Sequence, residues 1–262
     1  MVVARRYEEL KVSHAKYKNV VMENIKLQRL EAFFYEINHP EIFNFFEQRR
    51  LRREIRAIAK NLSPMKTIAL DIASGTGNVA RHLQSFGLEV VACDLSFDML
   101  KRNDSRYRIR CDVGYLPFKS NSFNLITTYS AFHHFPDFTI ALKEICRVST
   151  KSCILYFDHD PFIKGNTKTK CNIFYSFMRK LVQIMGWWLW LLTKPIFWIR
   201  FFRYLVGGRR RHLRLLRDIN TKLTEINPLD ADEISKILRN NLFVVQVKKY
   251  GITSLIRAKR KI

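Results

Sequence analysis

The chain has 262 residues, of which 47% are hydrophobic and 26% charged, and its formal net charge is +23. This composition excludes a disordered chain, and the length allows one large domain or one domain with an insertion. The five cysteines form no C-x-x-C pair, so we expect buried thiols in a reducing compartment and no metal site. The first residues, MVVARRYEELK, contain no apolar signal core, and we therefore do not expect secretion.

The positive charge is concentrated in one segment. Residues 66–160 carry 11 basic and 10 acidic side chains, whereas residues 161–217 carry 13 basic side chains and no acidic one. Such a field attracts an anionic partner, which could be nucleic acid, anionic lipid or an acidic substrate. A solvated basic face is the simpler interpretation, but it does not account for the four tryptophans, which all lie in this segment.

The predicted elements change in type along the chain. Residues 1–60 have apolar side chains at helical spacing, interrupted at His39-Pro40, and they predict an N-terminal helical region. Short apolar runs then predict buried strands, and helical patterns follow the first three of the runs at 67–72, 89–93, 123–129 and 152–158. Strands that alternate with helices indicate a parallel sheet covered on both faces. Near the C-terminus, DADEISKILRNN predicts a helix, and LFVVQVKKY and ITSLIRAKR predict an antiparallel hairpin at the sheet's edge.

A glycine-containing turn follows the first predicted strand, with the sequence Asp71-Ile-Ala-Ser-Gly75-Thr-Gly77. Gly75 and Gly77 let the backbone turn tightly and approach a ligand, and the helix expected from near Asn78 points its amides at that ligand. Asp94 ends the second strand, where a carboxylate can accept hydrogen bonds from ribose hydroxyls. Because the carboxyl ends of parallel strands meet at one edge of a sheet, we expect a ligand site there.

Two kinds of adenosine-containing ligand fit this turn. Gly75-x-Gly77-x-x-Ala80 matches the dinucleotide fingerprint, which makes NAD one alternative. Asp71 argues against NAD, because a carboxylate at the turn is unfavourable beside a pyrophosphate and favourable beside a cation. S-adenosylmethionine (SAM) carries an ammonium and a sulfonium group and no phosphate.

Over roughly residues 66–160 the sequence resembles the class I SAM-dependent methyltransferases, in IALDIASGTGNVARHL, VVACDLSFDML, CDVGYLPFKSNSFNLITTYSAFHHFPD and ALKEICRV. The two strands within 242–258 match the family's closing hairpin. Ala73 replaces the first glycine of the family's D/E-x-G-x-G-x-G motif, a departure that a small residue tolerates. The resemblance implies an α/β fold with a Rossmann-like, seven-stranded, mostly parallel sheet and an antiparallel C-terminal hairpin.

The resemblance also implies four regions along the chain. They are an N-terminal helical lid (1–65), a SAM-binding core (66–160), a basic aromatic helical insertion after the fifth strand (161–217) and the C-terminal part of the methyltransferase domain (218–262).

SAM is the cofactor that the resemblance implies, and the matching positions assign residues to it. These are Asp71, Ala73, Gly75 and Gly77 at the methionine part, Asp94 at the ribose, Leu95, Met99, Asp112 and Val113 around the adenine, and Tyr129 beside the sulfonium. Leu95 and Met99 are equally consistent with core packing.

Methyl transfer is an in-line displacement, so alignment of the reactants can supply much of the rate, and a general base is needed only for a protonated acceptor. The candidates follow the fourth and fifth strands: His133, His134 and Asp158, with His159 and Asp160 beside them. The motif S-A-F-H-H-F-P-D also resembles a structural motif of the family, in which one histidine faces inward and the other packs.

The segment 161–217 predicts two helices, CNIFYSFMRKLVQIMGWWLWLLT and FWIRFFRYLV, broken at Lys194-Pro195. Its longest uncharged run, Leu181 to Thr193, has 13 residues, whereas a transmembrane span needs about 20 apolar residues. Tryptophan and phenylalanine beside lysine and arginine are typical of a membrane interface.

We therefore expect a cytoplasmic methyltransferase, peripheral on the inner face of the cell membrane, that acts on a small lipophilic acceptor such as a quinone precursor or another lipid. One alternative is an RNA methyltransferase in which the basic aromatic insertion tracks phosphates and stacks bases. Another is a soluble small-molecule methyltransferase in which the insertion is a helical cap or a dimer interface.

Overall fold

The computed structural model describes residues 2–33, 35–63, 67–161, 231–250 and 253–261. The predicted insertion, with its two helices and all four tryptophans, lies outside these described residues, apart from the backbone of residue 161 at its start.

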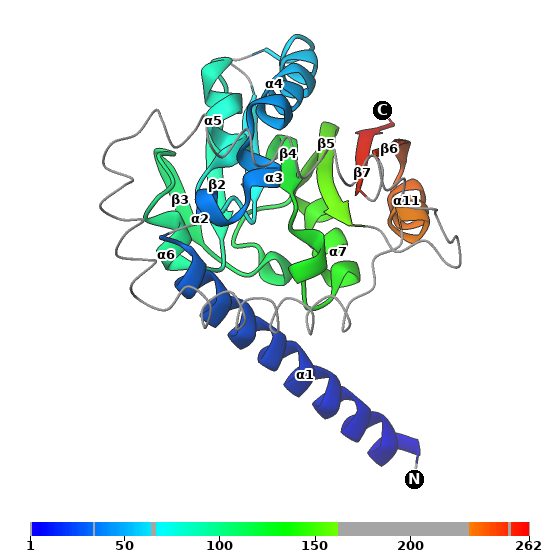
Figure 1. The fold of residues 1–262 in the computed structure, drawn as a ribbon. Coiled ribbons are helices and arrows are strands. Elements are labelled where there is room, and N and C mark those ends of the chain that lie inside the picture. The colour runs from blue at the N-terminus through cyan, green and yellow to red at the C-terminus, as the bar shows by residue number, and fades with distance from the viewer. Residues whose placement is uncertain (1, 34, 64–66, 162–230, 251–252, 262) are drawn as a thin grey trace, which may run out of the picture.

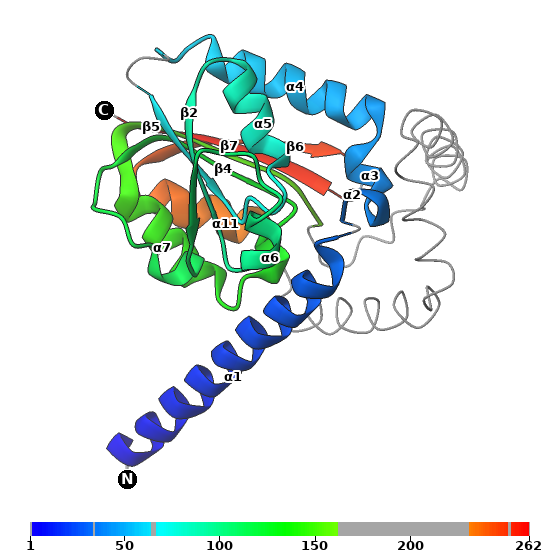
Figure 2. The ribbon, with the colours of Figure 1, turned by 90° about the vertical axis from the view of Figure 1, so that its left-hand side faces the viewer.

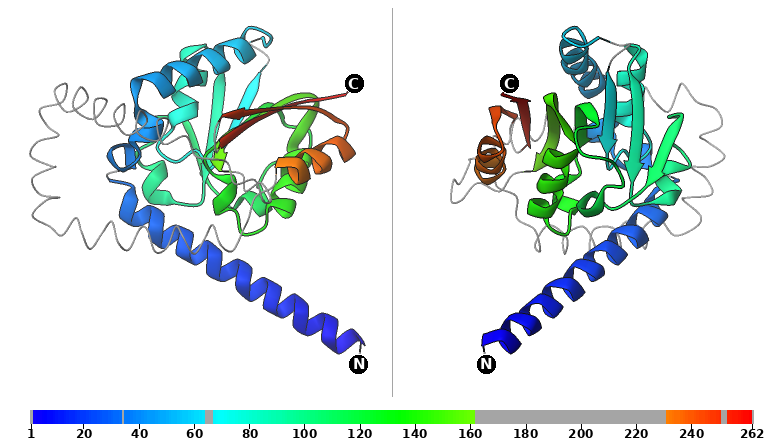
Figure 3. Two further views of the ribbon diagram at one scale, coloured as in Figure 1. Left: turned by 45° about the vertical axis from the view of Figure 1, so that its right-hand side comes forward. Right: turned by 180° about the vertical axis from the view of Figure 1, so that it is seen from behind.

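A seven-stranded sheet forms the centre of the fold, in the order β3-β2-β1-β4-β5-β7-β6 (Figure 1). Its strands are β1 (Ile68–Ile72), β2 (Glu89–Asp94), β3 (Tyr107–Arg110), β4 (Phe123–Tyr129), β5 (Ser149–Pro161), β6 (Phe243–Tyr250) and β7 (Thr253–Arg260). The strands β1 to β5 pair in parallel, and β7 runs antiparallel to both β5 and β6. The mostly parallel sheet and its antiparallel C-terminal hairpin are thus confirmed, with β3 and β6 at opposite edges (Figure 3).

Helices cover both faces of this sheet, as its continuous apolar strands require. They include α5 (Asn78–Ser85), α6 (Phe97–Leu100), α7 (Phe138–Val148) and α11 (Ala231–Asn240). In Figure 2, α4 (Phe45–Ala59) and α5 lie above the strands, and α7 and α11 lie below them. Neighbouring strand residues supply opposite faces: Ala69 packs in the cluster of α4 and α5, and Leu70 packs in the cluster of α7 and α11.

The N-terminal region is helical, as predicted, with α1 (Val2–Glu31), α2 (Tyr35–Asn38) and α3 (Pro40–Phe43) ahead of α4. The predicted break at His39-Pro40 is present, because α2 ends at Asn38 and α3 begins at Pro40. The first turn of a helix tolerates proline, whereas a helix interior does not. Asn44 caps α4 by accepting a hydrogen bond from the Glu47 amide over 3.0 Å.

The helix α1 extends from the body of the protein, and its C-terminal half lies at the carboxyl ends of the parallel strands (Figures 1 and 2). Val20, Asn24 and Leu27 are buried, and their spacing of four and three residues places them on one helical face. Among the helices that the structure describes, none has the length and apolar character of a bilayer span.

Candidate active site

The turn between β1 and α5 has a left-handed backbone at three residues, Ala73 (φ 50°), Gly75 (φ 53°) and Gly77 (φ 89°). Glycine adopts this conformation without penalty, whereas a residue with a Cβ loses about 1–2 kcal/mol there. Gly77 is also required by space, because an added Cβ would lie 2.9 Å from Oδ1 of Asn103. Backbone strain of this kind is concentrated at functional sites. Ala73 keeps the left-handed conformation although it stands where the family's motif has glycine.

Asp71 ties this turn to the neighbouring strand β4. Its buried carboxylate accepts hydrogen bonds from Ser74 Oγ over 2.5 Å and from Thr127 Oγ1 over 2.7 Å. Burial raises the pKa of Asp71 to about 6, although these hydrogen bonds oppose the shift.

Asp94 holds the same turn against the end of β2. Its two oxygens accept hydrogen bonds from the amides of Gly75 and Ser96, both over 2.8 Å. Burial raises the pKa of Asp94 to about 6, against the effect of these backbone donors. Each carboxylate oxygen has two lone pairs, so both retain capacity for a ribose hydroxyl.

Two small neighbouring cavities, of about 40 and 30 Å³, meet at Ala73, which lines both. Together they bring eight of the ten predicted cofactor residues to one edge of the sheet. The larger is lined by Ala73, Asp94, Leu95, Asp112 and Val113, and the smaller by Asp71, Ala73, Gly75 and Tyr129. The other two, Gly77 and Met99, line neither cavity: Gly77 caps α5, and Met99 is buried in the core at 2% exposure.

The helix α1 closes the larger cavity, where Asn24 and Gln28 are lining residues. The Tyr17 hydroxyl donates to Asp112 Oδ1 over 2.8 Å, and Asn24 Nδ2 donates to the His134 carbonyl over 2.7 Å. The sequence-based prediction missed Tyr17, Asn24 and Gln28. Their spacing of seven and four residues, which puts three polar side chains on one helical face, is a signal that could have identified them.

The chemistry of these residues fits SAM. The two carboxylates Asp71 and Asp94 suit a cation and a ribose, and a strained turn allows a close backbone approach. Ligand pockets usually enclose roughly 300–1,000 Å³, and α1 lines the larger cavity, so we expect this helix to shift outward when SAM binds.

The two adjacent histidines after β4 differ in environment. Both belong to a short 3₁₀ helix, η3 (Phe132–His134), and their rings are 4.0 Å apart. His133 is buried, and its Nδ1 lies 2.9 Å from Asp160 Oδ1. His134 lines the larger cavity, and burial lowers the pKa of its ring well below the ordinary value, which keeps the ring neutral.

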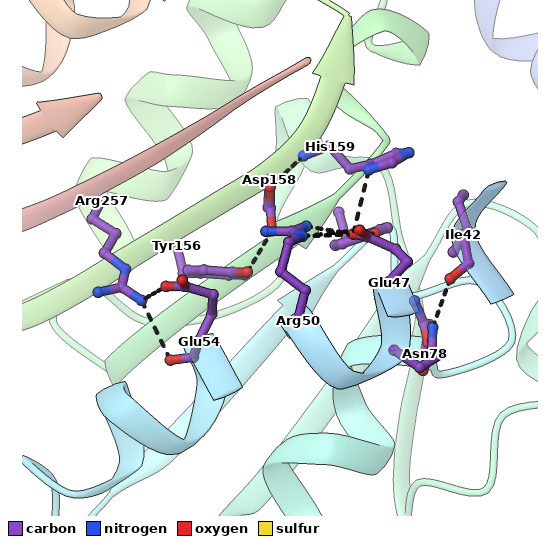
Figure 4. A network of polar contacts seen from close by, with 11 residues as sticks. Ile42, Glu47, Arg50, Glu54, Asn78, Tyr156, Asp158, His159 and Arg257 are labelled. Atoms are coloured by element: carbon purple, nitrogen blue, oxygen red, sulfur yellow. Dashed lines mark hydrogen bonds and ion pairs between the residues drawn. The ribbon is translucent and has the colours of Figure 1, made fainter. Parts of the chain in front are cut away.

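Asp158 is part of a buried polar network at the ends of β4 and β5 (Figure 4). Its Oδ2 accepts hydrogen bonds from Arg50 Nη2 over 2.8 Å and from the Tyr156 hydroxyl over 2.5 Å, and its Oδ1 accepts one from the His159 amide over 2.8 Å. Burial raises the pKa of Asp158, against the effect of the Arg50 charge. Because protein donors engage both oxygens, the geometry favours a structural ion pair over a base that faces the acceptor.

Glu47 and Arg50 of α4 complete this network, and the sequence-based prediction did not include them. Glu47 Oε1 accepts a hydrogen bond from the Tyr129 hydroxyl over 2.6 Å, and Arg50 Nε donates to Glu47 Oε2 over 2.9 Å. Burial alone would raise the pKa of Glu47, but hydrogen bonds from His159, Arg50 and Tyr129 outweigh it and lower this pKa to about 2. Glu47 is therefore ionised throughout the physiological range.

Residues 70–157 match the family model described as "Methyltransferase domain". Among solved structures, a SAM-dependent methyltransferase of Thermotoga maritima has a TM-score of 0.50 and 15% identity, and the alignment covers 90% of this chain and all of that one. A protein of Pyrococcus horikoshii has a TM-score of 0.51 and 16% identity over 84% of this chain and 94% of its own. These likenesses confirm the Rossmann-like fold. Fold, family match and site together define the chain as a class I SAM-dependent methyltransferase with SAM as its cofactor.

Among curated proteins, the chain is 28% identical to the demethylmenaquinone methyltransferase of Thermotoga maritima over 210 residues, which cover 78% of this chain and 81% of the relative. It is 34% identical to the Streptomyces griseus protein of the same name over 106 residues, which cover 39% of this chain and 46% of that relative. The chain thus aligns with less than half of the length of the second relative.

Proposed function

We propose that this enzyme methylates a small lipophilic acceptor of the quinone class, in its reduced form, at an anionic membrane surface. The observation that carries the proposal is the similarity to demethylmenaquinone methyltransferases, which in one case extends over 81% of the relative. The acceptor is taken to be reduced because the hydroxyls of a hydroquinone make its ring a nucleophile, whereas a quinone ring is electron-poor.

The outer face of α4 supports the membrane part of this proposal. At its start, Phe45 and Phe46 are 68% and 66% exposed, with their rings in edge contact at 5.7 Å. Four exposed arginines follow on the same face: Arg49, Arg52, Arg53 and Arg56. Both acidic residues of the helix, Glu47 and Glu54, are turned toward the protein.

Exposed aromatic rings beside arginines are typical of a helix that lies in a membrane interface. Each basic residue close to an anionic surface adds about 1 kcal/mol of binding free energy. The inner face of the same helix carries Glu47 and Arg50 to the ends of β4 and β5. A surface that binds α4 therefore lies close to the site where a lipophilic acceptor would react.

Flotation with vesicles tests the membrane contact. The protein should float with vesicles of phosphatidylglycerol and phosphatidylcholine, and much less with phosphatidylcholine alone. The double variant Phe45→Ser/Phe46→Ser should lose most of this binding. Phe97→Ser, which removes an exposed phenylalanine from α6, is the matched control and should float like the wild type.

Incubation with labelled SAM tests the acceptor. Vesicles that contain reduced demethylmenaquinone should yield a product heavier by one methyl group, as measured by mass spectrometry. The RNA alternative would be supported instead by two results together. The label would enter an RNA fraction and no lipid, and the protein would bind RNA in a salt-sensitive way without floating with vesicles.

A further inference from the structure

His159 lies at an irregularity of β5 that redirects its side chain. The register with β7 shifts between Phe157, which pairs with Ile256, and Asp160, which pairs with Ser254. Three steps along β5 thus match two along β7, which is a β-bulge, and His159 has a left-handed backbone with φ 64°. In a regular strand His159 would face the side of Phe157, toward α7. The bulge instead brings its ring to the α4 side, against Tyr129 and Glu47.

Two contacts hold the imidazole in this position. Its ring stacks on Tyr129 with centroids 5.1 Å apart and an angle of 8° between the planes. Its Nδ1 lies 3.5 Å from Glu47 Oε1, the oxygen that also accepts the Tyr129 hydroxyl (Figure 4). Because Glu47 engages Nδ1, the other nitrogen, Nε2, is the one that remains to take a proton from an acceptor.

The stacking partner places His159 beside the predicted methyl-transfer position. Tyr129 lines the smaller cavity together with Asp71, Ala73 and Gly75 of the cofactor turn. The family resemblance assigns the sulfonium to the neighbourhood of Tyr129. Tyr129 thus contacts both the imidazole and the cavity of the cofactor turn, and the His159 side chain keeps 16% of its surface exposed.

We propose that His159 is the general base that takes a proton from the acceptor, and that Glu47 is the positioning residue that fixes its ring. This proposal rests on the proposed function, which supplies an acceptor with a ring hydroxyl. Among the described residues, the titratable and charged groups around the ring are Arg50 and Glu47 from α4, Tyr129 from β4 and Asp158 from β5. The ionised Glu47 accepts a hydrogen bond from the Nδ1–H group, and this leaves Nε2 as the basic nitrogen of the ring.

Nε2 of His159 takes the proton of an acceptor hydroxyl, and the electron pair left on the acceptor forms the bond to the methyl carbon. When bound, SAM supplies that carbon, and the pair of the broken carbon–sulfur bond stays on sulfur as a thioether. When the new bond forms at a ring carbon, that carbon loses its hydrogen as a proton and the oxygen is reprotonated. In both cases one proton is released for each methyl group transferred.

A second histidine–carboxylate pair at the ends of β4 and β5, His133 with Asp160, is the competing candidate. His133 packs on His134, which lines the larger cavity at the adenosine side, and its ring nitrogen and backbone amide both approach the same Asp160 oxygen. This arrangement indicates that the pair stabilises the turn after β4. His133 thus belongs to the adenosine side of the site, whereas His159 stacks on Tyr129 at the methionine side.

The pH dependence of kcat/KM distinguishes the two pairs, with reduced demethylmenaquinone in vesicles as the acceptor. His159→Gln should lower kcat by about 100-fold or more and remove the acidic limb of the profile. SAM affinity, measured by calorimetry, should change less than about threefold. Glu47→Gln should lower kcat with little change in KM, and Glu47→Asp should restore part of it. His82→Gln, on α5, is the control histidine.

Chemical modification of histidine tests the same assignment without turnover. Diethyl pyrocarbonate should modify His159 in the wild-type protein, and acceptor added with S-adenosylhomocysteine should protect it, as read by mass spectrometry. The proposal is overturned when His159→Gln keeps the acidic limb, when His133→Gln alone removes it, or when the acceptor gives no protection. A wild-type protein that binds SAM but methylates only another acceptor refutes the proposed function instead, and the profile is then measured with that acceptor.

Discussion

The hydroxyl of Tyr17 donates a hydrogen bond to the carboxylate of Asp112 over 2.8 Å. This bond joins the N-terminal helix to the residue that the family resemblance assigns to the adenine. A Cβ added at Gly114 would overlap the same hydroxyl, so the backbone after Asp112 is shaped around Tyr17. The Tyr17 hydroxyl of α1 and an adenine amino group would thus compete for the same carboxylate.

Removal of this bond should make SAM binding tighter and faster. Tyr17→Phe weakens the closed arrangement by roughly 1–2 kcal/mol, and the larger open fraction raises the apparent affinity by about 5- to 30-fold. Calorimetry and stopped-flow fluorescence measure the two effects, and Tyr107→Phe on β3 is the control. Weaker binding by Tyr17→Phe would show that the hydroxyl contacts SAM in place of competing with it.

Asp94 should be essential for the cofactor. Asp94→Ala removes the acceptor of the ribose hydroxyls and also releases the Gly75 amide, so the SAM dissociation constant should rise at least about tenfold. Calorimetry with SAM measures the change. A protein that gives heat with NAD and none with SAM would contradict the assignment of the whole turn.

The free energy of unfolding should depend on the pH through Asp94. Burial raises the pKa of Asp94 from 3.8 to about 6, so between these values the folded chain holds a proton that the unfolded chain has lost. Its contribution to stability is therefore greatest below pH 4 and is lost as the pH rises through 6. Relative to the wild type, the free energy of unfolding of Asp94→Asn should rise by up to about 3 kcal/mol between pH 4 and pH 7.

Urea unfolding at pH 4, 5 and 7 measures this difference, with Asp98→Asn on α6 as the matched control. A difference between Asp94→Asn and the wild type that stays constant over this range would contradict the raised pKa.

Substitutions of two neighbouring arginines of α4 should differ sharply in their effect on the free energy of unfolding. Arg50 is paired with Glu47 and with the buried Asp158, so Arg50→Met leaves uncompensated carboxylates and should lower the free energy of unfolding by about 3–5 kcal/mol. Arg49→Met changes an exposed face and should cost less than about 0.5 kcal/mol. Chemical unfolding at neutral pH measures both, and equal effects would contradict the inward network.

The sequence predicted the central parallel strands β1, β2, β4 and β5 well, because they are largely buried and appear as short apolar runs, as in Phe123–Tyr129. No such run marks β3, whose residues Tyr107–Arg110 are largely exposed at the sheet's edge. The cofactor turn was also predictable, since glycine and aspartate at a strand end have few other uses. Eight of the ten assigned residues gather at two adjoining cavities, although their contacts with SAM remain predictions.

The residues contributed by the N-terminal helices could not be found in the same way. A charged residue on a helix, such as Glu47 or Arg50, usually faces solvent, and only the packing of α4 on the sheet shows that these two face inward. The bulge at His159 is equally invisible, because strand periodicity predicts the opposite face for that side chain.

The single helix α4 carries an aromatic, arginine-rich outer face and a carboxylate inner face. In the proposed function, the outer face rests on the bilayer while the inner face orients the base. Leu51 and Ile55 between these faces are fully buried and anchor α4 on the sheet, so the fold itself fixes the separation of Glu47 from the outer face. One helix would then act as a spacer that holds the proposed base at a set height above the surface that stores the acceptor.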